Sequence, residues 1–410
     1  MSNIPKIRFK GFTDAWEQRK LGEIATYRNG KAHEANQLDV GTYELVNLNS
    51  ISIDGGLKPS GKFIEDGSDT LQRNDLVMVL SDVGHGDLLG RVAIIPENNR
   101  YVLNQRVALL RINDDTNTYF LFSIINRYQD YFKKLGAGSS QLNISRGIVE
   151  NFEVAYPNVA EQRMIADYFQ SLDHLITLHQ RKCDNMKKIK KFMLQKMFPK
   201  KGEKFPEIRF EGFTDAWEQR KLGEICDSFE YGLNAAATDY DGENKYIRIT
   251  DIDDNSHEFL QNNVTSPDID FSGAENYKLK QGDILFARTG ASVGKTYIYK
   301  ESDGLVYYAG FLIRGRVKEE YSPEFVFQNT LTADYERFIR ITSQRSGQPG
   351  VNAQEYASYQ IATPVLAEQQ KIGAYFSTLD HLITLHQRKS DELKEMKKYM
   401  LQNMFPDGRK

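Results

Sequence analysis

Apolar residues recur every seven positions along two stretches of about 40 residues, 160–200 and 367–410. A heptad sustained over this length is typical of coiled-coil helices rather than of helices inside a globular core. Asn158 provides a capping-box-like start for the first helix, and Pro199 and Pro406 end the two helices. Each helix is therefore expected to be roughly 55 to 60 Å long. The positions expected in the core of the helix pair are Ile165, Leu172, Ile176, His179, Met186, Ile372, Leu379, Ile383, His386 and Leu393.

These two stretches are copies of each other, and a second pair of copies precedes them. Ala160–Pro199 recurs as Ala367–Pro406 with 27 of 40 positions identical, and Pro5–Ile24 recurs as Pro206–Ile225 with 18 of 20. A period near 200 residues is too long for a solenoid and predicts two domain-sized halves related by pseudo-twofold symmetry. We therefore expect the two helices to pair antiparallel within the chain.

His179 and His386 lie on the apolar row near the middle of each helix, so an antiparallel pair brings them near each other. A hydrogen-bonded polar layer that fixes the register is the simpler interpretation. A metal site or a pH switch is the alternative.

The segments between the copies share little sequence, but their elements are expected in a similar order. In the first segment, strands are expected at Leu76–Leu80, Val92–Ile95 and Val107–Ile112, followed by a helix at Tyr119–Lys134. In the second, strands are expected at Tyr246–Thr250, Ile284–Ala287, Thr296–Tyr299 and Phe311–Val317, followed by a helix that begins at Ser322.

The predicted fold is α+β, with two similar domains joined by two long antiparallel coiled-coil helices in a pseudo-twofold internal repeat. The expected boundaries are 1–159 for the first domain, 160–200 for the first helix, 201–366 for the second domain and 367–410 for the second helix.

Composition narrows the class of protein. The 53 basic and 56 acidic side chains give a net charge of -3, which excludes a uniformly cationic nucleic-acid binder but allows a local basic face. Two cysteines, Cys183 and Cys226, are too few for a disulfide framework. The first residues do not have the pattern of a secretory signal, and no segment has the ~20 apolar residues of a membrane span. We therefore expect a cytoplasmic protein with no membrane partner.

Several apparent catalytic or ligand motifs fail when their spacing is examined. Gly290–Thr296 resembles a phosphate-binding loop but has three residues between its glycines where four are needed, so a glycine hairpin is expected. Asp251, Asp253 and Asn255 suggest a calcium loop, but Ser256 replaces its required glycine. The sequence has no Gly-x-Ser-x-Gly, His-Glu-x-x-His or Asn-Pro-Pro-aromatic motif. A chain without catalytic, metal or cofactor residues is predicted.

Polar and basic residues gather on predicted loops, often beside glycine. Arg matches guanine and Asn or Gln matches adenine through paired hydrogen bonds, while Ser, Thr and Lys commonly contact phosphates. The candidate DNA-contacting residues are Asn104, Gln105, Arg106, Ser139, Ser140, Gln141, Asn143, Arg146, Arg248, Arg288, Thr289, Ser292, Lys295, Gln344, Arg345, Ser346, Gln348 and Asn352.

The order of variable domain, helix, variable domain and helix resembles the specificity subunit of type I restriction-modification systems. The helix starts Val159-Ala160-Glu161-Gln162 and Leu366-Ala367-Glu368-Gln369 carry the resemblance, and Gly282–Arg288 is similar to a recurring stretch of that family's target recognition domains. The two halves differ where Leu80-Ser81-Asp82-Val83-Gly84 stands in the first and Phe286-Ala287-Arg288-Thr289-Gly290 in the second, so the same loop need not contact DNA in both.

The resemblance implies a non-catalytic subunit of a methyltransferase and endonuclease complex. Each target recognition domain would bind one half of a bipartite, asymmetric site in double-stranded DNA, and the helices would set the spacer. Two modification subunits and the restriction subunits would assemble around the chain. The cofactors S-adenosylmethionine, ATP and Mg²⁺ are expected on those partners, and none in this chain.

Two rival functions remain at this point. A self-contained methyltransferase or nuclease is disfavoured by the missing motifs. A coiled-coil scaffold that joins proteins without binding DNA accounts for the helices, but it leaves the two divergent domains without a role.

Overall fold

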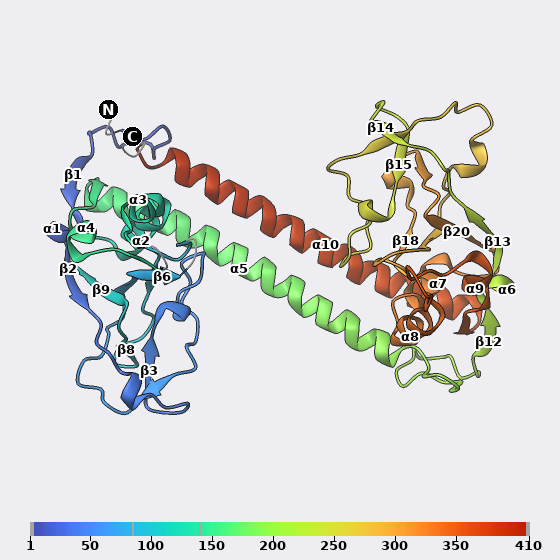
Figure 1. Ribbon diagram of the computed structural model, residues 1–410, viewed down its shortest axis with the longest axis horizontal. Coiled ribbons are helices and arrows are strands. Elements are labelled where there is room, and N and C mark those ends of the chain that lie inside the picture. The colour runs from blue at the N-terminus through green and yellow to red at the C-terminus, as the bar shows by residue number, and fades with distance from the viewer. Residues whose placement is uncertain (1–3, 84–85, 139–140, 407–410) are drawn as a thin grey trace. The chain divides into compact units, whose positions relative to one another are not determined.

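The computed structural model describes residues 4–83, 86–138 and 141–406. It divides into two compact units: unit 1 contains the chain up to Leu178 and again from Lys389 onward, and unit 2 contains His179–Arg388. Both unit boundaries fall within the long helices α5 (Val159–Lys196) and α10 (Leu366–Asn403), which are coloured green and red in Figure 1. Each unit therefore contains the start of one helix and the end of the other.

Unit 1 is built around a four-stranded antiparallel sheet. The strand order is β2 (Ala25–Asn29), β9 (Val107–Ile112), β5 (Leu76–Val79) and β7 (Val92–Ile94). The central strand β5 is apolar at every position because the sheet is buried on both faces. Leu76 and Met78 face the core that contains the helices, whereas Val77 and Val79 face a second apolar cluster. The three strands predicted for this segment are confirmed.

Smaller elements complete unit 1. A second sheet contains β4 (Phe63–Ile64), β3 (Tyr43–Val46) and β8 (Tyr101–Leu103), and two further antiparallel pairs join β1 (Glu17–Lys20) to β11 (Glu153–Tyr156) and β6 (Ser81–Val83) to β10 (Gln141–Asn143). The remaining helices are α1 (Leu21–Ile24), α2 (Thr118–Arg127), α3 (Gln129–Leu135), α4 (Arg146–Glu150) and the 3₁₀ turns η1 (Glu34–Asn36) and η2 (Leu48–Ser50).

The single helix predicted at Tyr119–Lys134 is wrong, because the chain breaks at Tyr128 into α2 and α3. The backbone of Tyr128 is outside the helical region, at φ -101° and ψ 26°. Asn126 holds the end of α2 through two hydrogen bonds of 3.1 Å to the backbone of Val92. This is a tertiary contact that helical periodicity does not reveal.

Unit 2 repeats this architecture. Its main sheet has the order β13 (Cys226–Tyr231), β20 (Leu312–Val317), β17 (Ile284–Ala287) and β18 (Thr296–Ile298), and β17 is again apolar at every position. Its second sheet contains β14 (Ala237–Asp239), β16 (Thr265–Pro267), β15 (Lys245–Ile247) and β19 (Val306–Tyr308), and β12 (Glu218–Lys221) pairs with β21 (Gln360–Thr363). The helices are α6 (Leu222–Ile225), α7 (Pro323–Asn329), α8 (Ala333–Thr342), α9 (Ala353–Ser358) and the 3₁₀ turns η3 (Ile249–Asp251), η4 (Glu275–Tyr277) and η5 (Glu301–Asp303).

Most predictions for this segment are confirmed, including the hairpin of β17 and β18 and the Ser322 cap of α7. The strand predicted at Tyr246–Thr250 is too long. It ends at Ile247 because Asp251 accepts a hydrogen bond of 2.9 Å from the backbone N–H of Arg248 and starts η3.

Within each unit the two helix segments run antiparallel, and the same contacts occur in both. Lys397 pairs with Asp173 in unit 1 and Lys190 with Asp380 in unit 2, each at 2.6 Å. The residues just after each helix also insert an aromatic ring into the core. Phe405 stacks on Phe169 in unit 1 and Phe198 packs on Phe376 in unit 2, with ring centroids 5.9 Å apart in both cases.

Candidate nucleic-acid interface

Four backbone segments meet at one end of the main sheet of unit 1: the end of β2, the turn between β8 and β9, the residue after β5, and the segment between α3 and α4. Leu80 donates a backbone hydrogen bond of 2.9 Å to Arg106, and Ile144 donates one of 2.9 Å to Leu80. Lys31, just beyond β2, forms a parallel bridge with Asn104. The site therefore combines residues from four distant parts of the sequence.

Unit 2 builds the same site from different residues. Arg288 donates a backbone hydrogen bond of 3.1 Å to Phe311, and Val351 donates one of 2.8 Å to Arg288. Leu233 forms the parallel bridge with Ala309. Because the contacts match, Leu80 is structurally equivalent to Arg288, Arg106 to Phe311 and Ile144 to Val351. On the neighbouring strands β2 and β13, Asn29 is equivalent to Tyr231.

Glycine is required at one matched position of both sites. A Cβ on Gly30 would lie 1.8 Å from the carbonyl oxygen of Asn104, and a Cβ on Gly232 would lie 2.4 Å from that of Ala309. No side chain fits such a close approach of two backbones. The frame of the site is therefore common to both units, while the side chains on the frame differ.

The structure gathers several of the predicted DNA-contacting residues of unit 1 at this site. Arg106 is exposed and has a left-handed backbone, with φ 68°. Gln141 donates to the Ser81 hydroxyl, and Asn143 is exposed. Gln105 is half-buried and donates to Glu34.

The other candidates of unit 1 have structural contacts or cannot be placed. Asn104 is buried, and its side chain accepts a hydrogen bond of 2.8 Å from the backbone of Gln105. Arg146 pairs with Glu150 at 2.8 Å. Ser139 and Ser140 lie outside the described residues.

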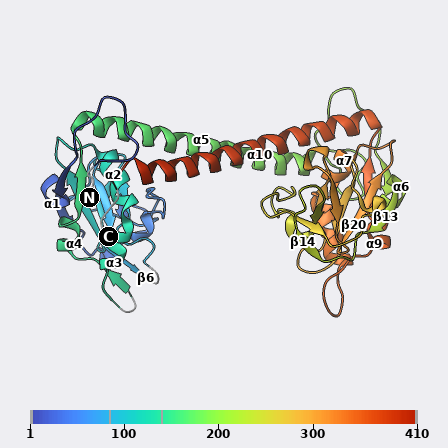
Figure 2. The same ribbon diagram turned by 90° about the horizontal axis from the view of Figure 1, so that it is seen from above.

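In unit 2 the site contains Arg288 and Thr289 on the β17 side and Gln344, Ser346 and Gln348 on the loop between α8 and α9. A bridge between Thr289 and Gly350 joins the two sides, and the three loop residues are exposed. Figure 2 shows this loop extending away from the sheet.

Other candidates of unit 2 make internal contacts. Arg248 forms a bidentate pair with Asp251 at 2.8 and 2.9 Å, and Arg345 pairs with Glu355 at 2.5 Å. Asn352 caps α9 by accepting a hydrogen bond from Glu355. The remaining two candidates, Ser292 and Lys295, belong to the β17–β18 hairpin. The Ser292 carbonyl accepts a hydrogen bond of 3.0 Å from the backbone N–H of Lys295. The Lys295 ammonium donates to the Ile252 carbonyl and pairs with Asp254.

Two aromatic residues at this site, Tyr231 and Phe311, were not among the predicted residues. Both are exposed, at 43% and 62%. Each stands beside a glycine in the sequence, and that adjacency is the one local signal that marks them.

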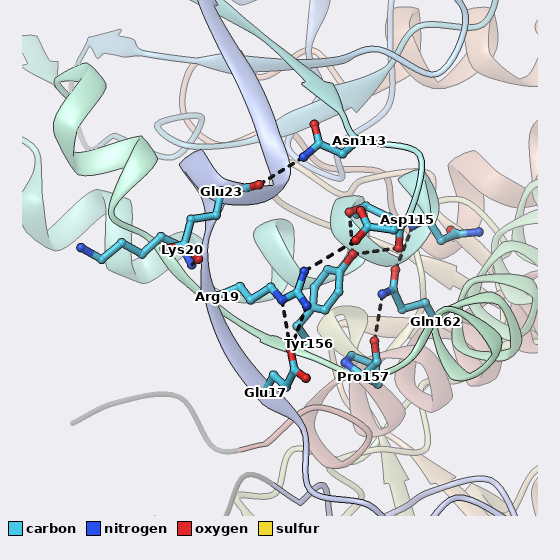
Figure 3. Close-up of polar contacts among 11 residues, drawn as sticks. Glu17, Arg19, Lys20, Glu23, Asn113, Asp115, Tyr156, Pro157 and Gln162 are labelled. Atoms are coloured by element: carbon cyan, nitrogen blue, oxygen red, sulfur yellow. Dashed lines mark hydrogen bonds and ion pairs between the residues drawn. The ribbon is translucent and has the colours of Figure 1, made fainter.

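The repeated segments Pro5–Ile24 and Pro206–Ile225 make the same polar contacts in both units. In Figure 3 the guanidinium of Arg19 lies over the ring of Tyr156, 4.7 Å from its centroid, and pairs with Glu17 at 2.9 Å and Asp115 at 3.6 Å. Gln162, at the start of α5, donates 2.9 Å to the carbonyl of Pro157. In unit 2, Arg220 pairs with Glu218 and Gln369 donates to Pro364, so the same contacts recur.

A buried ion pair ties each repeated segment to its long helix. Arg8 binds Glu161 through two bonds of 2.6 and 2.8 Å, and Arg209 binds Glu368 through bonds of 2.7 and 2.8 Å. The hydrogen bonds to these carboxylates raise the pKa of both arginines.

The residues expected in the helix core are buried or half-buried in their own units. His179 and His386, both in unit 2, lie with their Nδ1 atoms 2.9 Å apart. Burial lowers the pKa of His386, and the neighbouring His179 and Lys182 lower it further. One ring must donate its proton to the other, so the pair forms the hydrogen-bonded layer that the simpler interpretation describes.

The described residues provide neither a metal-binding cluster of side chains nor a membrane-spanning helix. The part of the chain that the structure describes contains no cluster of three or more His, Cys, Asp or Glu side chains arranged to hold a metal ion. Within the same residues, no helix is both long enough and apolar enough to cross a bilayer. Burial raises the pKa of the Cys226 thiol to about 12, which keeps it from acting as a thiolate.

Comparison with known proteins identifies the family. The model of the type I restriction modification DNA specificity domain matches residues 13–188 and again 214–395. Two relatives from Methanocaldococcus jannaschii are each 22% identical to this chain: the type I restriction enzyme MjaVIII specificity subunit, with 96% of this chain and 92% of the relative aligned, and the putative MjaX specificity subunit, with 99% and 96%.

The fold is also found in a solved structure. The S subunit of a type I restriction-modification system from M. genitalium superposes with a TM-score of 0.68 at 16% identity, over 99% of this chain and 100% of that one. The two matches to the family model coincide with the two halves of the internal repeat. The chain therefore belongs to the type I restriction-modification DNA specificity family.

Proposed function

We propose that this chain is the non-catalytic DNA-recognition subunit of a type I restriction-modification complex, and that each domain binds one half of a bipartite, asymmetric site. The observation that carries this proposal is the pair of matched four-segment sites. Their backbone frames are alike, but Arg106 stands in unit 1 where Phe311 stands in unit 2, and Leu80 where Arg288 stands. One frame with two sets of side chains is what recognition of two different sequences requires.

The helices α5 and α10 would set the spacer between the half-sites. A helix of 38 residues is about 57 Å long, whereas half-sites one DNA turn apart have centres about 34 Å apart. The repeated ion pairs and aromatic anchors support a rigid role, because they fix each helix to its unit at matched positions.

Repeated exposed residues support the docking of two identical partners, which we take to be modification subunits. Leu178 on α5 and its copy Leu385 on α10 are 37% and 50% exposed, and Phe192 and its copy Tyr399 are 50% and 57% exposed. Apolar side chains exposed at matched places on both helices are typical of a surface covered by a partner. In this proposal S-adenosylmethionine, ATP and Mg²⁺ bind the modification and restriction subunits, and this chain holds no cofactor.

The test is to co-express the full chain with its modification subunits in a host that lacks adenine methylation, and to map methylated adenines by sequencing. A single bipartite motif with a constant gap is expected. The scaffold alternative predicts no motif, and also no DNA retardation by the assembled complex.

A domain exchange tests the division of labour. Replacing residues 25–159 with the equivalent segment of another family member should change one half-site and leave the other half-site and the gap unchanged. A change in both half-sites would contradict the assignment of one half-site to each domain.

A further inference from the structure

The recognition site of unit 2 contains a guanidinium held between aromatic and backbone groups. The Cζ atom of Arg288 lies 4.9 Å from the centroid of the Tyr231 ring, and its Nη1 is 3.4 Å from the carbonyl oxygen of Gly310. Stacking on an aromatic face attracts a guanidinium and fixes its plane. Arg288 is thus held in a defined orientation at the edge of the site.

Arg288 also differs from its neighbouring arginines in its charge environment. Among the residues that the structure describes, no carboxylate lies within ion-pair distance of it, whereas Arg314 is paired with Glu230 and Arg345 with Glu355. The carboxylates of Glu230, beside Tyr231, and Glu355, after the α8–α9 loop, are therefore paired with other arginines. The positive charge of Arg288, which is half-buried, remains available for an external acceptor.

Phe311 is joined to Arg288 through the backbone and directly follows Gly310, whose carbonyl the guanidinium contacts. The Arg288 backbone N–H donates 3.1 Å to the Phe311 carbonyl, and the Phe311 side chain is 62% exposed at the tip of the turn before β20. An exposed phenylalanine gains nothing from contact with phosphate, but it can pack against the apolar groups of base edges. In the major groove the apolar group is the C5-methyl of thymine.

We infer that Arg288, oriented by Tyr231, recognises a guanine of the second half-site through its O6 and N7 atoms, and that Phe311 packs on the methyl group of an adjoining thymine. The inference rests on the proposed function and extends it to particular bases. Unit 1 has Asn29, Leu80 and Arg106 at the three matched positions, so its half-site is recognised without this cluster.

Substitutions in the complex with modification subunits provide the first test. Arg288→Lys keeps the charge but loses the paired hydrogen bonds, and Phe311→Ala removes the apolar contact. We expect methylome sequencing to show relaxed preference for one guanine with the first variant and for a neighbouring thymine with the second. The first half-site should be unchanged in both.

Two control variants test whether these effects are specific to the site of unit 2. Arg106→Ala at the matched position should alter only the first half-site. Phe205→Ala removes an aromatic side chain of similar exposure, 53%, on the segment after α5, and should leave the motif intact.

Modified bases in the target duplex identify the contacts themselves. Replacing the guanine by 7-deazaguanine should weaken binding of the wild-type complex about tenfold or more, and binding of Arg288→Lys much less. Replacing the thymine by uracil should weaken wild-type binding about fourfold and leave Phe311→Ala unaffected, since one methyl group is removed from the contact.

The outcomes distinguish a failure of the proposed function from a failure of the inference about Arg288 and Phe311. A wild-type complex that methylates no bipartite motif overturns the proposed function and this inference with it. A wild-type motif whose second half-site is unchanged in Arg288→Lys and Phe311→Ala overturns this inference alone. If Phe311→Ala loses as much affinity relative to wild type on the uracil duplex as on the thymine duplex, the thymine methyl contact is rejected. That result indicates that Phe311 inserts between bases instead.

Discussion

The residues just after α10 should contribute a large part of the stability of unit 1 through one side chain, Phe405. Phe405 is 2% exposed, stacks on Phe169, and has its ring centroid 6.3 Å from Trp16 and 5.9 Å from Phe120. A phenylalanine buries about 200 Å², which at about 25 cal/mol per Å² corresponds to about 5 kcal/mol. Measured Phe→Ala substitutions in cores cost about 3–5 kcal/mol, so we expect Phe405→Ala to lower the free energy of unfolding of unit 1 by about 4 kcal/mol.

The change can be measured by thermal unfolding of the full chain. Unit 1 has roughly 200 residues, and for this size about 1 kcal/mol shifts Tm by about 2–4 °C, so the transition of unit 1 should move down by about 8–16 °C. The repeat provides a matched test, because Phe198→Ala should lower the transition of unit 2 in the same way. Tyr399→Ala, on the same helix but 57% exposed, serves as the control. A shift no larger for Phe405→Ala than for Tyr399→Ala would refute the anchoring role.

Three further predictions follow from the contacts. Arg8→Met leaves the buried carboxylate of Glu161 without its partner and should destabilise unit 1 by about 3–5 kcal/mol in urea unfolding, whereas the double variant with Glu161→Met should recover most of the loss. Gly30→Ala should cost about 1–3 kcal/mol or more by the same measurement, because its Cβ would overlap the carbonyl of Asn104. Gly147→Ala, whose Cβ would lie 3.9 Å from the Ser145 hydroxyl in an ordinary contact, should have little effect. Because the pKa of His386 is lowered in the folded state, the unfolded state binds more protons below about pH 6.5, and the urea midpoint of unit 2 should fall as the pH decreases through that value. His386→Gln should flatten this dependence, and an unchanged slope would show that the histidine pair does not contribute.

The site residues of one half of the repeat cannot be predicted from those of the other half. The positions equivalent to Tyr231, Arg288 and Phe311 are Asn29, Leu80 and Arg106, and the residue type differs at all three. They correspond because the backbone hydrogen bonds and bridges around them are the same. The frame is maintained by buried strands and by Gly30 and Gly232, which constrain the backbone and leave the exposed side chains free to change.

The features that depend on local periodicity and on the repeat can be predicted from the amino-acid sequence alone. The heptads predict α5 and α10 within a few residues, the apolar runs predict the central strands β5 and β17, and the duplication predicts two similar α+β domains. These patterns can be recognised in the sequence because helices and buried strands place residues of one kind at fixed intervals.

The contacts between distant segments become visible only in the folded chain. The heptad does not reveal that Phe405 enters the core of unit 1 and Phe198 that of unit 2. It also does not reveal that Arg345 and Lys295 make internal ion pairs, whereas Arg288 has none among the residues that the structure describes. Such contacts join residues far apart in the chain, and their free energy comes from packing and from the desolvation of charge, which depend on three-dimensional neighbours and leave no periodic trace in the sequence.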